Sequence, residues 1–199
     1  RKVKVLLQDV DRVRWRQDLV EDRNRLATLL SAARAVTADR DAKLEALKQV
    51  IARKIKTPIN ADNRKVLLFT AFADTAEYLY RELAPWAKTA LGINTAVVSG
   101  TGANKTTVRN LRSDMGTILS AFSPRSKERP VELADEGEID FLIATDCISE
   151  GQNLQDCDFL INYDIHWNPV RIIQRFGRID RIGSTNTQIQ LVNFWPNME

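Results

Sequence analysis

The sequence predicts a three-layer α/β domain with a mostly parallel sheet, preceded by an α-helical arm. After residue 63, short apolar runs alternate with helical stretches, which is typical of strands joined by helical crossovers. Residues 10–56 contain no Gly or Pro and repeat apolar side chains at helical spacing. The chain has 199 residues, of which 44% are hydrophobic and 28% charged, so it can bury a full core. A disordered protein is therefore excluded.

The arm is expected to hold two helices. Apolar residues recur at helical spacing in two stripes, Leu26, Leu29, Leu30 and Ala33 in the first and Leu44, Leu47, Ile51 and Ile55 in the second. The break between the helices is expected near residues 37–41, where Thr37 or Asp39 can cap the second helix. The segment 58–63 (PINADN) favours turns. We therefore predict an arm and linker over residues 1–63 and a second domain over residues 64–199.

The charge of the chain is unevenly divided. Residues 1–57 carry 15 Lys and Arg against 8 Asp and Glu, whereas the rest of the chain carries 14 against 18. A basic helical arm indicates a nucleic acid or another polyanion as partner. A solvated helix face explains the same charges without a partner, and charge alone does not decide between these interpretations.

The second domain is expected to contain five buried parallel strands, because its apolar runs are unbroken. These runs are Val66–Thr70, Thr95–Ser99, Ile139–Thr145, Phe159–Tyr163 and Ile189–Phe194. Helices are expected over residues 74–91, with Pro85 kinking or dividing the first of them, and around residues 106–122. The polar segment 123–130 is expected to be a mobile loop.

Several classes of protein are excluded by what the composition lacks. No apolar run approaches the roughly 20 residues of a membrane span, and the first residues do not resemble a signal peptide. Cys147 and Cys157, with His166 as the one histidine, support neither a zinc site nor a disulfide framework. We expect a cytoplasmic protein with no metal site in this chain and with both thiols in or near the core.

The segment Ser99–Thr106 (SGTGANKT) imitates a phosphate-binding loop between a strand and a helix. Asn104 stands where such a loop needs glycine before its lysine, and the segment is also too short. A Cβ at that position obstructs the tight backbone wrap around phosphate. No acidic strand end for Mg²⁺ accompanies it. The chain alone is therefore not expected to hydrolyse ATP.

A stronger pattern begins at Asn168 and Pro169, which suit the N-cap and first turn of a helix. At about 100° per residue, Gln174 shares one face with three arginines, Arg171, Arg178 and Arg181. The apolar residues Ile172, Ile173, Phe176 and Ile179 are expected to face inward. Gly177 is expected to mark a close backbone approach, and the helix is expected to end near residues 179–181.

Arginines on one exposed face suit the charge that develops on a transferring phosphoryl group, because guanidinium is always charged and presents a rigid donor fork. Face geometry alone favours the simpler alternative, a salt-bridged surface helix.

The motifs resemble those of superfamily 2 helicases. The segment 174–183 (QRFGRIDRIG) is similar to helicase motif VI, and residues 144–154 (ATDCISEGQNL) to motif V. Residues 65–72 (KVLLFTAF) resemble motif IV. Residues 98–100 (VSG) resemble the end of the strand that follows motif IV in this family, with its glycine. With Trp167-Asn168-Pro169 before motif VI, the chain resembles the SWI/SNF-type branch, most closely its bacterial RNA-polymerase-associated ATPases. Ser184 and the run 149–151 depart from that branch, so DNA translocation, RNA unwinding and protein displacement stay open.

The resemblance implies the second RecA-like domain of a two-domain motor, with ATP and Mg²⁺ held mainly by a first domain. It implies that Arg178 and Arg181 act as arginine fingers and that Gln174 lies at the same cleft. Asp146 and Gly151 correspond to positions that link the nucleotide to nucleic acid. The positions implied to contact nucleic acid are Thr70, Phe72, Gly100, Thr145, Ser149 and Asn153.

These observations together predict the C-terminal motor domain of a nucleic-acid-dependent ATPase, either a helicase or a double-stranded DNA translocase. The expected partners are DNA rather than RNA, the first RecA-like domain of the same protein, and RNA polymerase or another protein complex. No membrane partner is expected. The alternative is a non-catalytic module that binds nucleic acid or protein on a helicase scaffold, with the basic arm as its docking element.

Overall fold

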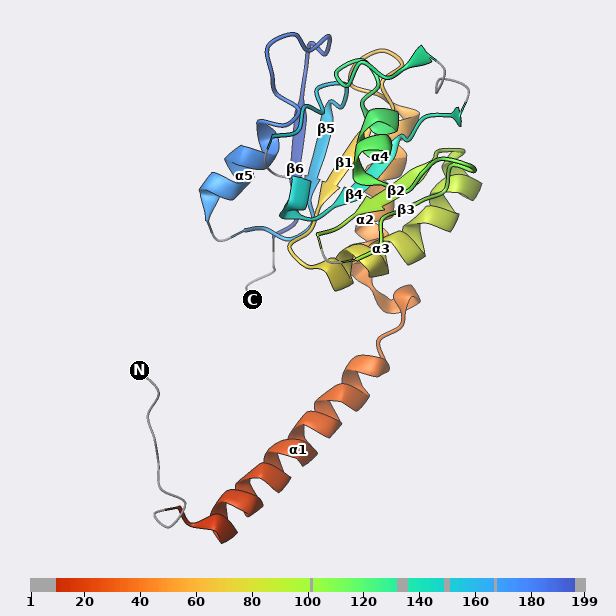
Figure 1. The fold of residues 1–199 in the computed structure, drawn as a ribbon. Helices are drawn as coiled ribbons and strands as arrows, with labels where there is room; N and C mark the ends of the chain where they lie inside the picture. Colours follow the sequence, from red (N-terminus) through yellow and green to blue (C-terminus); the bar gives the residue numbers. More distant parts are fainter. Residues whose placement is uncertain (1–9, 101, 132–135, 149–150, 167, 196–199) are drawn as a thin grey trace. The chain divides into compact units, whose positions relative to one another are not determined.

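The computed structural model describes residues 10–100, 102–131, 136–148, 151–166 and 168–195 (Figure 1). It divides the chain into two compact units, residues 1–45 and residues 46–199. Residues 46–63, which the sequence grouped with the arm, thus belong to the unit that contains the sheet. Among the described residues, none of the helices is long and apolar enough to cross a membrane.

The first unit is built on α1 (Arg12–Arg34). Asp11 caps this helix by accepting hydrogen bonds from the backbone N–H groups of Val13 and Arg14. No residue of α1 is buried. A short 3₁₀ turn, Ala38–Arg40, separates α1 from α2 (Ala42–Lys56), so the predicted break between the two helices is confirmed.

The helix α2 carries the second apolar stripe, and all four of its residues, Leu44, Leu47, Ile51 and Ile55, are buried. Their i, i+3, i+7 and i+11 spacing places them on one face of the helix. In contrast, the stripe on α1 is exposed, with Leu26, Leu29 and Leu30 all at least half accessible. The same sequence pattern therefore has two different outcomes in this chain.

The sheet has six strands in the order β3-β2-β4-β1-β5-β6. Its strands are β1 (Val66–Phe69), β2 (Thr95–Val98), β3 (Lys105–Thr106), β4 (Phe141–Ala144), β5 (Phe159–Asn162) and β6 (Gln190–Asn193). All neighbours pair in parallel except β2 and β3, which pair antiparallel. The fold class is therefore confirmed, and the five predicted strands all form.

Three further helices complete the domain. Pro85 lies inside α3 (Ala73–Trp86) and does not divide this helix. α3 continues directly into a π-helical turn, Ala87–Leu91. α4 (Met115–Phe122) is capped by Asp114, and α5 (Pro169–Phe176) lies between β5 and β6. The prediction of a helix beginning near residue 106 is wrong, because residues 105 and 106 instead form the edge strand β3, which pairs with β2.

The core on one face of the sheet is formed by α4 and alternate strand residues. Leu67 and Phe69 of β1 and Leu142 and Ala144 of β4 pack there with Phe122 of α4. α3 lies on the opposite face, as the right-handed crossover from β1 to β2 requires (Figure 1). The carboxyl ends of the parallel strands are left at a single edge.

Candidate functional site

Four of the predicted site residues follow strands that end at the carboxyl edge of the sheet. Phe69 of β1 pairs with Ala144 of β4 and with Asn162 of β5, and Val98 of β2 pairs with Ala144. These strands therefore end in one row, and the residues that follow them meet at one edge. Ligands of open parallel sheets bind outside this edge. Those following residues include Thr70, Gly100, Thr145 and Asp146.

The loops after β1 and β2 present different kinds of groups. Thr70 is buried, and its hydroxyl donates a hydrogen bond to the carboxylate of Asp164. Phe72, just before α3, is 66% exposed. A Cβ on Gly100 would lie 3.3 Å from the Cβ of Cys147, so the loops after β2 and β4 approach closely there. Phe72 and Gly100 are thus open to a ligand, whereas the Thr70 side chain is engaged inside the protein.

The loop after β4 carries the motif V residues. Thr145 is buried, and Asp146 begins a short 3₁₀ turn. Gly151 is exposed with φ of +72°, a conformation that favours glycine. Asn153 is partly buried, while Ser149 lies outside the described residues.

α5 begins as predicted and ends earlier. The Asn168 side chain accepts a hydrogen bond from the Val170 N–H, and Pro169 occupies the first turn. The helix ends at Phe176, so the predicted end at residues 179–181 is wrong. The backbone turns at Gly177, where a Cβ would lie 3.4 Å from the nearest atom, the Ile173 carbonyl oxygen of the same helix.

The predicted inward face of this segment is correct only in part. Ile179 is buried in the core, but Ile173 is 67% exposed. Because α5 stops at Phe176, residues 177–181 do not continue the 100° progression on which the projection depended.

Arg178 and Arg181 follow the end of α5. Arg178 is partly buried and its Nε donates to the Gln174 carbonyl oxygen at 3.1 Å. Arg181 is exposed and its Nε donates to the Gly177 carbonyl oxygen at 3.2 Å. The Leu154 N–H donates to the Arg178 carbonyl oxygen at 2.9 Å, which fastens the loop after β4 to the arginine segment.

Gln174 itself is partly buried, and its Oε1 lies 3.5 Å from Nη1 of Arg171. The charged hydrogen-bond donors of residues 171–181 are guanidinium groups, which suit a phosphate anion.

Arg175 is a residue that the sequence analysis missed. Its side chain is 0% exposed and forms a bidentate ion pair with Asp146, at 2.7 Å from Nε to Oδ1 and 3.0 Å from Nη2 to Oδ2. Motifs V and VI are therefore joined by an ion pair whose arginine is buried and whose aspartate is partly exposed. The preference of arginine for exposure hides this in the sequence. The one available signal was the need of Asp146 for a cationic partner.

Lys127 is a second missed residue. Its Nζ donates to Oε1 of Gln152, in the loop after β4, at 2.6 Å. Partial burial, followed by the nearby positive charge of Arg181, lowers the pKa of Lys127 below its usual value. The segment 123–130 thus brings a further cation toward the arginines.

The loop that imitates a phosphate-binding motif is used differently. Lys105 lies in β3 and forms an ion pair with Glu77 of α3. The Gly102 N–H donates to the hydroxyl of Ser99, so this backbone donor is bonded to a side chain of the same loop. Within the described ranges, no group of three or more His, Cys, Asp or Glu is placed to hold a metal ion.

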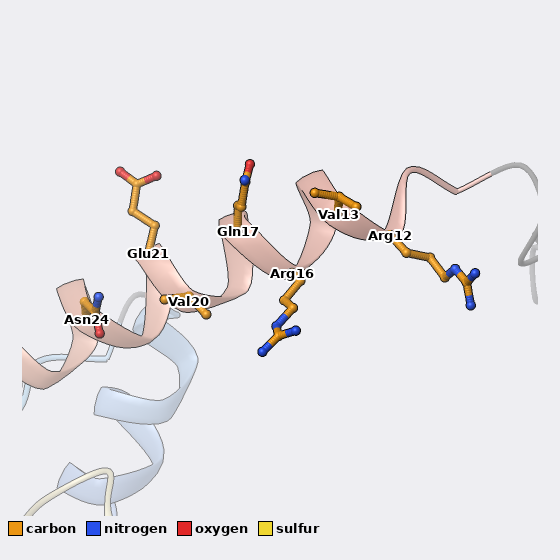
Figure 2. Close-up of a pocket in the computed structure, with 7 residues that line it drawn as sticks. All are labelled: Arg12, Val13, Arg16, Gln17, Val20, Glu21 and Asn24. Carbon is orange, nitrogen blue, oxygen red and sulfur yellow. The ribbon is translucent and has the colours of Figure 1, made fainter.

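Two hollows are lined by other residues. One, of about 610 Å³, is at the amino ends of the strands and is lined by polar residues that include Asn60, Lys65 and Asp156. The other lies along α1, and Figure 2 shows its lining residues Arg12, Val13, Arg16, Gln17, Val20, Glu21 and Asn24. All seven belong to one helix, so they form a surface strip. Neither hollow contains a predicted site residue.

Comparison with known proteins gives matches over most of the chain. Residues 42–183 match the family model of the helicase conserved C-terminal domain. The chain is 57% identical over 47 residues to an uncharacterized ATP-dependent helicase, YqhH, of Bacillus subtilis, a match that covers 24% of this chain and 8% of that protein. It is 27% identical over 139 residues to the ATP-dependent DNA helicase fml1 of Schizosaccharomyces pombe, covering 70% of this chain and 15% of that protein.

A solved structure, the C-terminal part of the Fun30 ATPase domain, has a similar fold. Its TM-score is 0.51 at 20% identity, and the match covers 76% of this chain and 39% of that chain. The chain thus spans a small part of the length of the relatives that it matches.

Proposed function

The chain belongs to the helicase conserved C-terminal domain family, and from this premise we propose that it is the second RecA-like domain of a nucleic-acid-dependent ATPase. In this proposal Arg178 and Arg181 reach the phosphates of ATP bound on a first RecA-like domain of the same protein. Mg²⁺ is held mainly by that first domain. The activity belongs to the pair of domains, and this chain alone is inactive.

The observation that carries the proposal is the position of the arginine segment. Arg178 and Arg181 follow α5, and the Arg178 carbonyl oxygen accepts a hydrogen bond from Leu154 of the segment between β4 and β5 that carries motif V. Arg181 is exposed, and Lys127 lies close enough to it for the two charges to interact. Such a set of cations at an open edge favours an anionic ligand, and a phosphoryl group fits its chemistry.

DNA is the proposed nucleic acid, and duplex translocation in the SWI/SNF manner is the proposed output. The fml1 match, to a protein named a DNA helicase, covers 70% of this chain, which favours DNA. The exposed Gly100, Phe72 and Gly151 offer the contacts to the strand, mainly through backbone groups that cannot read sequence. RNA polymerase or another protein complex is proposed as the partner on which the motor acts.

The test is ATP turnover by the full-length protein with Arg178→Ala and, separately, Arg181→Ala. An arginine finger contributes about 10³–10⁵-fold to rate in well-studied NTPases, so each variant should lose orders of magnitude in kcat while keeping its affinity for DNA. Arg109→Ala, at an exposed arginine away from the edge, is the matched control and should turn over normally. Turnover that survives both changes would rule out the finger role.

A second role, binding of nucleic acid by the arm, is favoured by α1. This helix is entirely exposed, and Arg12, Arg14 and Arg16 surround the half-exposed Trp15. Fluorescence polarisation of the 199-residue chain on duplex and single-stranded DNA across a salt series tests it. A steep fall of log affinity with log salt, flattened by replacing these arginines with alanine, indicates phosphate contacts. A flat dependence argues instead for protein docking.

A further inference from the structure

Lys127 is held next to the arginines that follow α5 by residues from a third part of the chain. Its Nζ donates a hydrogen bond to Oε1 of Gln152 at 2.6 Å. Two residues further on, the Leu154 N–H donates to the Arg178 carbonyl oxygen at 2.9 Å. This short stretch before β5 therefore contacts the lysine through a side chain and the arginine segment through its backbone.

The backbone just before Lys127 is fixed in the same place. The carboxylate of Asp156 accepts hydrogen bonds from the N–H groups of Arg125 and Ser126, at 2.7 and 3.0 Å, and from the Ser126 hydroxyl at 2.7 Å. Nη1 of Arg125 also donates to Oγ1 of Thr185, beyond the arginine segment, at 3.5 Å. The lysine is thus presented from an anchored turn.

The charge of Lys127 is not balanced by a carboxylate. Three other lysines of the same domain, Lys54, Lys65 and Lys105, each form an ion pair with an aspartate or glutamate. Lys127 is bonded instead to a neutral amide, and its pKa is lowered by partial burial and then by the charge of Arg181. Arg181 in turn donates to a backbone carbonyl oxygen. Two like charges held in this way favour an anion that both can contact.

The ammonium group has the properties that a phosphate ligand requires. It carries three donors, of which the bond to Gln152 uses one. That bond also orders the side chain before any ligand binds, which reduces the entropic cost of binding. An ammonium is a compact point charge, so it attracts phosphate oxygens without the fixed geometry that a guanidinium fork needs. Such an attraction acts before and during phosphoryl transfer alike, and therefore lowers KM without raising kcat.

We propose that Lys127 is a further ligand of the phosphates of ATP, beside Arg181, and that it contributes to nucleotide affinity and not to the transfer step. The inference rests on the proposed function, in which ATP is bound on a first domain and reached from this one. It adds to the arginine segment a cation from a separate part of the chain.

The experiment uses the full-length protein with Lys127→Met, Lys127→Gln or Lys127→Arg. It measures KM and kcat for ATP hydrolysis with saturating duplex DNA, equilibrium binding of the non-hydrolysable analogue AMP-PNP, and DNA affinity by polarisation. Loss of one charge-assisted contact should raise KM and the AMP-PNP Kd about tenfold in Lys127→Met and Lys127→Gln. Both variants should keep kcat and DNA affinity within about threefold of the parent. Lys127→Arg keeps the charge and should resemble the parent.

The matched control is Lys88→Met. Nζ of Lys88 donates to Oδ1 of Asn94 at 2.8 Å, so this lysine is also bonded to a neutral amide. It lies in the π-helical turn after α3, on the face of the sheet opposite α4. Lys88→Met should retain the KM of the parent. A thermal melt of every variant separates a change in nucleotide affinity from a loss of folded protein.

Three results would overturn the proposal. The first is an unchanged KM in Lys127→Met, or in Lys127→Gln if the methionine variant does not fold. The second is weaker DNA binding with unchanged AMP-PNP binding, which would assign the lysine to the phosphates of nucleic acid. The third is an equal rise of KM in Lys127→Arg or in Lys88→Met, which would show that the charge at this position is not the cause.

Failure of this inference is distinct from failure of the proposed function. The proposed function is decided by whether Arg178→Ala and Arg181→Ala retain ATP turnover. An unchanged KM in the Lys127 variants, together with inactive arginine variants, would remove the lysine alone from the nucleotide site.

Discussion

The ammonium group of Lys54 lies 2.6 Å from the carboxylate of Asp158, and neither side chain is exposed to solvent. Lys54 is near the end of α2, and Asp158 immediately precedes β5. Lys54 also donates to the Asn63 carbonyl oxygen at 2.9 Å. The pair therefore fixes α2 to the amino edge of the sheet, which explains why residues 46–63 belong to the sheet-containing unit.

Lys54→Met should destabilise this domain strongly. Removing one partner of a buried pair leaves the other charge uncompensated, at a cost of about 3–5 kcal/mol in the free energy of unfolding. Urea denaturation followed by circular dichroism measures it. Lys56→Met, on the exposed end of the same helix, should change the free energy of unfolding by less than about 0.5 kcal/mol. Equal effects of the two substitutions would contradict the role of the pair.

Asn60→Ala should release the connection between the residues before β1 and those before β6. Oδ1 of Asn60 accepts hydrogen bonds from the N–H groups of Thr187 and Gln188, and its Nδ2 donates to Asp158 at 2.8 Å. Loss of these bonds should lower the free energy of unfolding by about 1–3 kcal/mol, also measured by urea denaturation. Gln49→Ala, which removes an exposed amide from α2, is the control and should have little effect.

The strands could be predicted from the sequence because their signal is local. Each buried parallel strand is an unbroken apolar run, and Asn168-Pro169 specifies a helix start within two residues. The burial of Arg175 could not be predicted in this way, because its acceptors Asp146 and Asn162 lie 29 and 13 residues earlier in the chain. Only the fold brings them together, and the helical projection considered only Arg171, Arg178 and Arg181.

The Asn60 contacts were missed for the same reason. Asn60 is a turn former by local preference, and its partners Thr187 and Gln188 are 127 and 128 residues away. The early end of α5 was missed for a different reason. Ile179 continues the apolar helical spacing, whereas the chain leaves the helix at Gly177 with ordinary right-handed angles, φ −61° and ψ 0°.

The two cysteines should differ in reactivity. Both were expected in or near the core, but Cys147 is exposed and only Cys157 is buried. Burial raises the pKa of the Cys157 thiol to about 12, so at pH 8 its thiolate fraction is only about one in ten thousand. A thiol reagent should therefore modify Cys147 quickly in the native protein and Cys157 only when the protein unfolds.

Raising the pH should not make Cys157 reactive in the native protein. Between pH 8 and pH 10 the thiol stays unmodified, because burial holds its pKa above this range and keeps the reagent away from it. Cys147→Ala should remove the fast phase alone. A fast phase that persists in this variant would place the reactive thiol at residue 157 and contradict the burial.

Gly151→Ala tests whether the conformation of the motif V loop matters to function apart from stability. Gly151 has φ of +72° and Gly92 has φ of +66°, and in both places a Cβ would meet nothing within 4 Å. The two substitutions should therefore each cost about 1–2 kcal/mol through the left-handed backbone alone. Gly92 ends the π-helical turn after α3, remote from the carboxyl edge, so Gly92→Ala is a control matched in backbone strain.

Gly151→Ala and Gly92→Ala should have similar effects on stability but different effects on ATP hydrolysis. Urea denaturation should give similar losses for both variants, whereas DNA-stimulated ATP hydrolysis by the full-length protein should fall at least tenfold for Gly151→Ala alone. The reason is that alanine pulls residue 151 toward negative φ, which redirects the backbone N–H groups of a loop joined to Arg178 through Leu154. If both variants hydrolyse ATP equally well, the conformation of Gly151 serves the turn and not the motor.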